Sequence, residues 1–449
     1  MAELTKYETY KPSGINWIGE VPIDWKTLRI KNVASIVNGS TPSSSVEEYW
    51  DGDIIWATPG DFNKFDKIID DSESKITEAG YKSCGTSMVP VGSVVITTRA
   101  PIGNVLIAGK ELCTNQGCKS LVPNRIESRF LYYIISISSI ELNILGQGTT
   151  FLELSKESLG TFKLPLPKYD EQLAIANYLD NQTQKIDRLI ANKKAQAEKL
   201  KELRQIEINN AVTKGLKPNA EMPASSKVEM KDSGIEWLGK IPKHWEVKRL
   251  KNTTFINQSV ISEKTAPDYL IKYIDISNVN SMGEFIELQE MEFSEAPSRA
   301  RRIPKHNSIL LSTVRTYLRA IALVQNPDKN LIASTGFAVI DANQNLFNAS
   351  YLYFQMISHF LVESVIANSE GVSYPAISST KLGDIKIVIP PINEQSEIAN
   401  FLQQRTTAID QLIKNIEAQI EKLQELRKIR IYEAVTGKIK VNAYAEKTA

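Results

Sequence analysis

The chain has 449 residues, 42% of them hydrophobic, which is enough for about three packed domains and excludes a disordered protein. Its 53 basic and 52 acidic residues give a net charge of +1, so any nucleic-acid surface must be a local patch. No apolar run reaches the roughly 20 residues that cross a bilayer, the N-terminal segment lacks a secretory pattern, and the three cysteines suit a reducing compartment. We therefore expect a cytoplasmic protein without a membrane partner.

The first feature in chain order is a tryptophan segment that occurs twice. Residues 13–25, SGINWIGEVPIDW, recur 220 positions later at 233–245 as SGIEWLGKIPKHW. The tetrapeptides at 29–32 and 249–252 share the pattern Arg-x-Lys-Asn. A repeat of this length indicates a duplicated unit and an internal pseudo-two-fold symmetry.

A stretch of ordinary domain size follows each tryptophan segment. Short β-branched runs such as 93–98 and 308–313, separated by Gly, Pro and Asn, predict strands. Aromatic-rich segments at 128–135 and 349–356 predict helices. Each stretch is therefore predicted to be a mixed α/β (α+β) domain.

Two long, nearly identical segments follow the two domains. Residues 171–213 and 394–436 share 25 of 43 positions at a constant offset of 223. Prolines precede both segments, Asp170 and Asn393 are predicted N-caps, and apolar residues recur at steps of three and four. These patterns predict two long helices.

Forty-three helical residues span roughly 64 Å, and such a helix cannot bury an apolar stripe against itself. We expect the two helices to pair as an antiparallel coiled coil with one domain at each end; the alternative is that each helix packs on its own domain. The predicted core of the coiled coil comprises Ile186, Leu189, Leu200, Leu203, Ile409, Leu412, Ile416, Leu423 and Leu426. The predicted segments are a first domain (1–168), helix 1 (169–214), a linker with the second tryptophan segment (215–245), a second domain (246–391), helix 2 (392–436) and a tail (437–449).

Sequence motifs of the common enzyme classes do not occur. The chain has neither GxxxxGK[ST] nor GxGxxG for nucleotides, no HExxH metal motif and no nucleophile elbow, and its three histidines lie in unrelated contexts. The cysteines form no CxxC pair, so structural zinc is not expected. We expect a chain without catalytic residues, metal or cofactor of its own.

Aligning the two domains draws attention to polar residues at equivalent places. Residues 97–99 (TTR) align with 313–315 (TVR), 115–117 (NQG) with 334–336 (STG), and 147–151 (QGTTF) with 370–374 (EGVSY). Arg, Asn and Gln make paired contacts to base edges, whereas Ser and Thr commonly bind phosphates. Arg315, Tyr317 and Arg319 alternate, so on a strand they would share one face.

The DNA-binding candidates are Thr97, Arg99, Asn104, Asn115, Gln116, Lys119, Gln147, Thr149, Thr150, Arg301, Arg302, Thr313, Arg315, Tyr317, Arg319, Ser334, Thr335, Ser373 and Tyr374. The alternative for each is structural, because short basic clusters are commonly solvated surface and Gly-containing turns can serve the fold alone.

The repeated motifs resemble those of type I restriction–modification specificity (S) subunits. They are Glu-Gln-x-x-Ile-Ala-x-x-Leu at 171–179 and 394–402, Ile-Asp at 186–187 and 409–410, and Glu-Lys-Leu-x-Glu-Leu-Arg at 198–204 and 421–427. The tryptophan segments are also typical openings of target-recognition domains in this family. The resemblance covers nearly the whole chain.

That resemblance implies a non-catalytic, DNA-binding subunit for phage defence. Each of two target-recognition domains would read one half of an asymmetric, bipartite site in double-stranded DNA. The coiled coil would set the spacer and dock two methyltransferase (M) subunits for adenine-N6 DNA methylation, and restriction/translocase (R) subunits would add ATP-dependent cleavage. S-adenosylmethionine, ATP and Mg would belong to those partners.

Three alternatives remain open at this stage. The chain could serve a type IIB-like or other defence methyltransferase assembly, which neighbouring genes would reveal. It could be a coiled-coil scaffold with no DNA role, which a DNA-binding assay at low salt would test. It could be a stand-alone enzyme, which would show turnover by itself.

Overall fold

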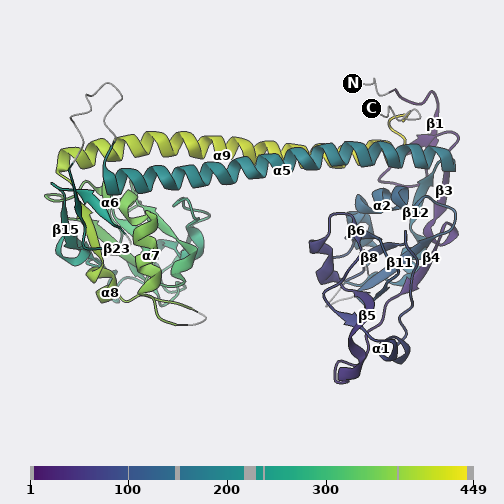
Figure 1. Ribbon diagram of the computed structural model, residues 1–449, viewed down its shortest axis with the longest axis horizontal. Helices are drawn as coiled ribbons and strands as arrows, with labels where there is room; N and C mark the ends of the chain where they lie inside the picture. Colours follow the sequence, from purple (N-terminus) through teal and green to yellow (C-terminus); the bar gives the residue numbers. More distant parts are fainter. Residues whose placement is uncertain are drawn as a thin grey trace. The chain divides into compact units, whose positions relative to one another are not determined.

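The computed structural model describes residues 5–99, 101–146, 152–216, 229–235, 238–371 and 374–441. The chain divides into two compact units, Met1–Lys193 with Ala418–Ala449 (unit 1) and Lys194–Glu417 (unit 2). The long helices are α5 (Tyr169–Lys214) and α9 (Ile392–Val435) (Figure 1). Each unit therefore combines one globular domain with part of both helices.

Unit 1 contains a five-stranded sheet in the order β4-β11-β8-β9-β6, a three-stranded sheet β10-β5-β7 and the pairs β1-β2 and β3-β12. Its strands are β1 (Tyr10–Pro12), β2 (Glu20–Pro22), β3 (Lys26–Arg29), β4 (Ala34–Asn38), β5 (Trp50–Ala57), β6 (Ile68–Ile69), β7 (Lys75–Ile76), β8 (Val94–Thr97), β9 (Val105–Ala108), β10 (Cys113–Thr114), β11 (Cys118–Pro123) and β12 (Lys163–Leu166). Its shorter helices are α1 (Glu78–Ser83), α2 (Ser128–Ser136), α3 (Ser139–Ile144), α4 (Lys156–Thr161) and the 3-10 turns η1 (Ile30–Asn32), η2 (Glu47–Tyr49) and η3 (Pro59–Lys64).

Unit 2 contains two four-stranded sheets, β16-β23-β20-β21 and β18-β17-β22-β19, and the pairs β13-β14 and β15-β24. Its strands are β13 (Met230–Asp232), β14 (Lys240–Pro242), β15 (Glu246–Arg249), β16 (Thr254–Ile256), β17 (Leu270–Ile274), β18 (Gln289–Glu292), β19 (Ala300–Arg302), β20 (Ile309–Ser312), β21 (Ile321–Leu323), β22 (Leu331–Ser334), β23 (Phe337–Ala342) and β24 (Lys386–Ile389). Its shorter helices are α6 (Ala349–Met356), α7 (His359–Ala367), α8 (Ser379–Asp384) and the turns η4 (Leu250–Asn252), η5 (Ile276–Asn278) and η6 (Thr316–Leu318).

The two domains share one strand arrangement and differ at its edges. The order β4-β11-β8-β9 in unit 1 corresponds to β16-β23-β20-β21 in unit 2. In both units a central strand, β5 or β17, pairs in parallel with one neighbour and antiparallel with another. Unit 1 adds β6 to the first sheet, and unit 2 adds β19 to the second. The domains have therefore kept a common scaffold and diverged at their edge strands.

The main core of each unit includes side chains from both long helices. In unit 1, Ile175 from the start of α5 and Val435 from the end of α9 are buried in the cluster that holds Phe130 of α2. In Figure 1, α2 lies between the strands and α5. Unit 2 repeats the arrangement with Ile398 from the start of α9 and Val212 from the end of α5, both offset by 223. Each domain core is therefore completed by the helix that follows its own domain and by the helix of the other copy.

A buried glutamine attaches each domain to its helix. Gln172 accepts a hydrogen bond from the Glu127 N–H at 2.8 Å and donates to the Pro167 carbonyl at 2.9 Å. Its counterpart Gln395 accepts from the Asn348 N–H at 2.9 Å and donates to the Pro390 carbonyl at 2.8 Å. Because both side chains satisfy backbone groups at the N-terminus of α2 or α6, the repeated Glu-Gln motif has a structural explanation.

Within each unit, the two long helices run antiparallel. In unit 2, Arg204 pairs with Asp410 at 2.8 Å and Glu207 with Arg405 at 2.9 Å. Residue numbers therefore increase along α5 in the direction in which they decrease along α9. In unit 1 the same pair recurs at an offset of 223, since Arg427 meets Asp187 at 2.9 Å. The predicted fold class, two mixed α/β domains with a paired antiparallel coiled coil, is confirmed.

The predicted N-caps of both long helices were wrong by two residues. Helix α5 begins at Tyr169 and α9 at Ile392, so Asp170 and Asn393 lie inside the first turn. The first helical hydrogen bonds run from Gln172 N–H to the Lys168 carbonyl at 2.9 Å and from Gln395 N–H to the Pro391 carbonyl at 3.0 Å. The buried glutamines are the fourth residues of α5 and α9, and their backbone N–H groups make these first helical bonds.

Four leucines predicted in the coiled-coil core are exposed instead. The exposed fractions are 49% for Leu189, 40% for Leu203, 51% for Leu412 and 38% for Leu426. Ile186 and Ile409 are buried, and Leu200, Ile416 and Leu423 are half-buried. The inward positions from Ile186 onwards alternate in steps of four and three (186, 190, 193, 197, 200, 204), and a leucine one position away points roughly 100° around the helix.

Among the residues that the structure describes, no helix is long and apolar enough to cross a membrane.

Candidate nucleic-acid interface

In unit 1, three segments meet at one end of the five-stranded sheet. The Thr98 N–H donates to the Gly117 carbonyl at 2.8 Å, and the Leu154 N–H donates to the Thr98 carbonyl at 2.9 Å. These bonds join the β8–β9 loop, the β10–β11 turn and the strand-like segment before α4. We call the described parts, residues 98–99, 101–104, 115–117 and 152–154, the convergent loops of unit 1.

Unit 2 builds the same junction with the same bonds. The Thr313 N–H donates to the Gly336 carbonyl at 2.8 Å, and the Ile377 N–H donates to the Thr313 carbonyl at 2.8 Å. The corresponding hydroxyls repeat the contact, because Thr98 and Thr313 also donate through Oγ1 to Gly117 and Gly336 at 3.2 and 2.9 Å. Residues 313–320, 334–336, 370–371 and 374–377 are the convergent loops of unit 2.

These hydrogen bonds shift the sequence alignment of residues 97–99 with residues 313–315 by one residue. Because Thr98 and Thr313 make the same bonds, Arg99 corresponds to Val314 and not to Arg315. The isolated β-bridges Arg99–Glu153 and Val314–Ala376 agree with this assignment. The loop of unit 2 holds one more residue, an insertion that the sequence alignment could not locate. The two copies therefore present arginines at different places.

Several predicted contact residues hold the loops and do not project from them. Thr97 is buried and donates to the Pro101 carbonyl at 2.6 Å. Asn115 Oδ1 accepts from the Gly117 N–H at 2.9 Å, and Ser334 Oγ accepts from the Gly336 N–H at 3.2 Å. These turns confirm that Asn115 and Ser334 are equivalent, and they commit one side-chain acceptor of each to the scaffold.

Other predicted residues are exposed on the convergent loops of unit 1. Arg99 is exposed, and its Nη2 lies 3.0 Å from a carboxylate oxygen of Glu153. Gln116 is exposed and hydrogen-bonds to the Thr41 hydroxyl, and Asn104 is exposed at the start of β9. A weak surface ion pair of this kind costs little to exchange for a contact with a ligand.

The exposed loop of unit 2 is a left-handed turn and not the predicted strand. Arg315 (φ 52°, ψ 49°) and Arg319 (φ 54°, ψ 33°) flank the 3-10 turn η6. Such conformations cost about 1–3 kcal/mol for residues other than glycine and cluster at functional sites. The alternation that suggested one shared strand face does not apply, because the backbone reverses here.

Aromatic side chains accompany these arginines. The guanidinium of Arg315 lies 4.6 Å from the centre of the Tyr374 ring, and Tyr374 is 60% exposed. Tyr317 is 52% exposed, while Arg319 pairs with Glu363 at 3.1 Å. An exposed cation stacked on an aromatic ring can contact a base edge or a phosphate.

Three predicted basic residues lie away from these exposed positions. Lys119 on β11 is buried, and burial lowers its pKa. To a smaller extent, the carboxylate of Glu153 raises this pKa and the guanidinium of Arg99 lowers it. Arg301 and Arg302 lie on β19, the strand found only in unit 2; Arg301 stacks over Phe293 at 5.4 Å. Burial lowers the pKa of Arg302, whose Nε has no hydrogen-bond partner among the described residues.

Thr335, by contrast, is exposed beside the start of β19, where its N–H donates to the Arg299 carbonyl at 2.7 Å.

Gln147, Thr149, Thr150 and Ser373 lie outside the described residues. Within the described ranges, no group of three or more His, Cys, Asp or Glu side chains is placed to hold a metal ion.

Exposed apolar side chains on the long helices were not recognised as a surface by the sequence analysis. In unit 1 they are Leu189, Leu426 and Ile429 at 49%, 38% and 43% exposure. In unit 2 the residues at an offset of 223 are also exposed, and they are Leu412, Leu203 and Ile206 at 51%, 40% and 55%. We call each set of three an apolar helix patch. In the sequence, these surfaces are indicated by a stripe of apolar residues along each long helix that is wider than the seam of a two-helix coiled coil requires.

A duplicated α/β domain that shares a core with a pair of long helices defines the class of protein. Residues 22–199 and 242–422 match the family described as "Type I restriction modification DNA specificity domain". Each matched segment covers one copy of the repeat and together they make up most of the chain. The chain therefore belongs to this family, and the resemblance drawn from the sequence is confirmed.

Individual relatives that are similar to this chain carry names from the same family. The chain is 29% identical over 437 residues to the type I restriction enzyme MjaIX specificity subunit of Methanocaldococcus jannaschii, covering 94% of this chain and 95% of that one. It is 24% identical over 468 residues to the putative MjaX specificity subunit of the same organism, covering 98% and 99%. A solved chain described as "Structural basis underlying complex assembly and conformational transition of the type I R-M system" has the same fold, with a TM-score of 0.66, 15% identity and coverage of 93% and 99%.

Proposed function

We propose that this chain is a DNA-recognition subunit whose two domains each read one half of an asymmetric, bipartite site in double-stranded DNA. The observation that carries the proposal is the pair of convergent loops. Their backbone bonds are the same in both units, whereas their exposed side chains differ: Arg99 stands where unit 2 has Val314, and Gln116 where it has Thr335. A common scaffold with different exposed residues suits two readers of different sequences.

The exposed residues of the two units favour different modes of contact. Unit 1 presents Arg99, Asn104 and Gln116, whose forked or amide groups suit hydrogen bonds to base edges. Unit 2 presents Arg315, Tyr317 and an exposed Tyr374, which suit a cation–aromatic contact as well. Thr97, Thr313 and Ser334 support the loops, so we assign them a positioning role.

The paired helices have two roles in this proposal. They set the spacer between the half-sites, and they dock two M subunits, with R subunits added for ATP-dependent restriction in the cytoplasm. The apolar helix patches support docking, because exposed Leu and Ile side chains at an offset of 223 give each unit an equivalent surface for the same partner. The chain itself performs no chemistry, and S-adenosylmethionine, ATP and Mg belong to its partners.

Methylation mapping tests the reading function. The chain is co-expressed with its M subunit in a host that lacks other adenine methylation, and N6-methyladenine is located by sequencing. The expected result is one asymmetric motif in two parts with a spacer of fixed length. A continuous palindromic motif would contradict the proposal, and so would the absence of methylation at any recurring sequence.

Stoichiometry tests the docking role. Leu189→Glu with Leu426→Glu places two charges in the apolar helix patch of unit 1, and native mass spectrometry is expected to show one bound M subunit in place of two. Val91→Glu is the matched control, because Val91 is 63% exposed in unit 1 but lies outside both helices. If the helix variant still binds two M subunits, the patch is not the docking surface.

One alternative is a type IIB-like or other defence methyltransferase assembly with the same specificity subunit. It predicts the same bipartite motif, so the partner genes and the cleavage products distinguish it.

A further inference from the structure

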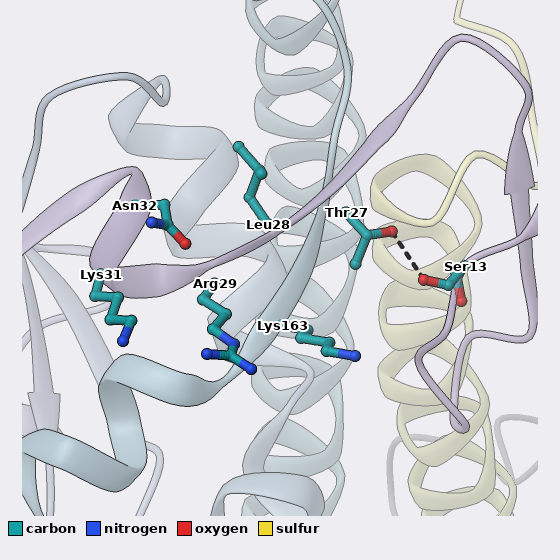
Figure 2. A pocket seen from close by; sticks show the side chains of 7 residues that line it. All are labelled: Ser13, Thr27, Leu28, Arg29, Lys31, Asn32 and Lys163. Atoms are coloured by element: carbon teal, nitrogen blue, oxygen red, sulfur yellow. Dashed lines mark hydrogen bonds between the residues drawn. The ribbon is translucent and has the colours of Figure 1, made fainter.

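Unit 1 contains a basic pocket, shown in Figure 2, whose lining residues include none of the convergent loops. It has a volume of about 410 Å³ and includes Arg29, Lys31 and Lys163 together with polar Asn32. Arg29 on β3 is paired directly with Lys163 on β12, and Figure 2 shows Arg29 between Lys31 and Lys163. Like charges directly opposite each other on paired strands are unfavourable unless an anion lies between them.

Among the described residues, no acidic side chain lines this pocket. Within the described residues, the side chains of Arg29 and Lys31 make no hydrogen bond or ion pair with the protein. Lys163 makes one long contact, 3.5 Å from its Nζ to the Gly14 carbonyl. The three cations are therefore available to a ligand.

Unit 2 contains the same three cations and neutralises two of them. Arg249 is paired with Lys386 on the neighbouring strand, as Arg29 is with Lys163. There Asp384 lies 3.2 Å from the Arg249 guanidinium and 2.7 Å from Lys251 Nζ. Asp384 is the last residue of α8. The last residue of α4, at an offset of 223, is Thr161, whose hydroxyl donates to the Ser158 carbonyl at 2.7 Å. A single substitution between the copies thus leaves one cluster without its counter-charge.

The chemistry of the pocket fits a phosphate group. An arginine fork and two lysines supply positive charge and several N–H donors, and Asn32 adds an amide. Asn32 of the pocket lies two residues before β4, and beyond the far end of β4 the Ser40 N–H donates at 2.9 Å to the carbonyl of Thr114, the residue before the convergent-loop segment 115–117. The five residues of β4 span roughly 17 Å, about the length of five base pairs of duplex.

We propose that Arg29, Lys31 and Lys163 bind a backbone phosphate of the DNA that flanks the first half-site. This inference rests on the proposed DNA-reading function. The contact carries no sequence information, because it involves phosphate and no base. It also makes the complex asymmetric, since the matching cluster of unit 2 is occupied by Asp384.

The test exchanges the distinguishing residue between the copies in the complex with the M subunit. Thr161→Asp supplies unit 1 with the carboxylate, Thr161→Asn is its uncharged control, and Asp384→Thr opens the cluster of unit 2. Affinity for a duplex that carries the mapped motif is measured by fluorescence anisotropy between 50 and 300 mM salt. Loss of the contact with this one phosphate reduces the magnitude of the slope of log K against log[salt] by about 0.9.

The expected result is a shallower salt dependence and weaker binding for Thr161→Asp, unchanged binding for Thr161→Asn, and a steeper dependence for Asp384→Thr, all with the same methylated motif. Arg29→Gln with Lys31→Gln should reproduce the loss without adding a charge. Equal affinity and slope in Thr161→Asp and Thr161→Asn would overturn the inference while leaving the reading function intact. Failure of the wild-type complex to prefer the motif would instead overturn the proposed function.

A competition arm separates DNA phosphate from free phosphate. Inorganic phosphate is added at constant ionic strength. If the pocket holds a DNA phosphate, added phosphate weakens DNA binding by the wild type towards the level of Thr161→Asp and leaves that variant unchanged. If the pocket is only a small-anion site away from the DNA, the wild type and Thr161→Asp bind DNA with equal affinity with or without added phosphate, and the inference is wrong.

Discussion

Replacing Gln395 with leucine is expected to destabilise unit 2 far more than its size suggests. Gln395 is fully buried and makes three hydrogen bonds to backbone groups: from Asn348 N–H at 2.9 Å, and to the carbonyls of Leu346 and Pro390 at 2.8 Å each. Leucine is similar in volume but can make none of them. The Pro390 carbonyl is then left buried without a partner.

The magnitude follows from those three bonds. A buried polar group left unpaired costs about 1–3 kcal/mol, and a lost bond to a partly exposed group about 0.5–1.5 kcal/mol. The sum is about 4 kcal/mol for Gln395→Leu. For a domain of this size, 1 kcal/mol lowers Tm by about 2–4 °C, so the transition of unit 2 should fall by about 8–16 °C.

Differential scanning calorimetry gives the transition, and hydrogen exchange localises the loss. Faster exchange is expected at the N-terminus of α6, where Asn348 is bonded. Gln404→Leu, an exposed glutamine on the same helix, is the control. If both variants melt within about 2 °C of each other, the reasoning that the buried glutamine attaches domain to helix is refuted.

Three further outcomes are expected. A double-mutant cycle on Arg204→Ala and Asp410→Ala should give a coupling of about 1 kcal/mol in unfolding free energy, because both side chains are largely buried; a coupling near zero would contradict the pairing. Burial lowers the pKa of the Lys119 side chain in the folded protein. At pH values between this lowered pKa and the ordinary lysine pKa, the unfolded chain binds more protons than the folded protein, so the free energy of unfolding rises with pH. Lys119→Met should therefore raise the urea-unfolding free energy at pH 7, with an advantage that shrinks towards pH 10; an advantage that does not depend on pH would refute this cause. Arg315→Ala should weaken binding to the second half-site by about 1–3 kcal/mol and leave the first half-site unchanged; equal loss at both half-sites, measured with duplexes mutated in one half at a time, would argue against separate readers.

The architecture was largely readable from the repeat. A constant offset of 223 over the helical segments predicted two equivalent long helices, and the pairs Arg204–Asp410 and Asp187–Arg427 occupy matching positions at that offset. The inward seam was only partly predictable. Local spacing does not distinguish a leucine that faces the partner helix from one a single position away, as Leu189 and Leu412 show.

The candidate site was less predictable. Residue type and repeat position drew attention to loops that converge in the structure, but they did not separate side chains that hold a loop from those that project from it. Thr97 and Ser334 bond to nearby backbone groups, which depends on loop conformation and not on composition. The position of Arg99 was misjudged because one inserted residue in unit 2 falls within the loop. The basic pocket was overlooked because its distinguishing feature is an absence, Thr161 where unit 2 has Asp384.

The central claim, that each domain reads its own half-site on a shared scaffold, is tested most directly by replacing domain 1 with a second copy of domain 2. Residues 26–168 would be exchanged for 246–391, which keeps both helices, and methylation would again be mapped in the complex with the M subunit. A symmetric motif is predicted, made of the second half-site and its inverted copy across the original spacer. Methylation of the original asymmetric motif, or of a motif unrelated to either half-site, would contradict the claim.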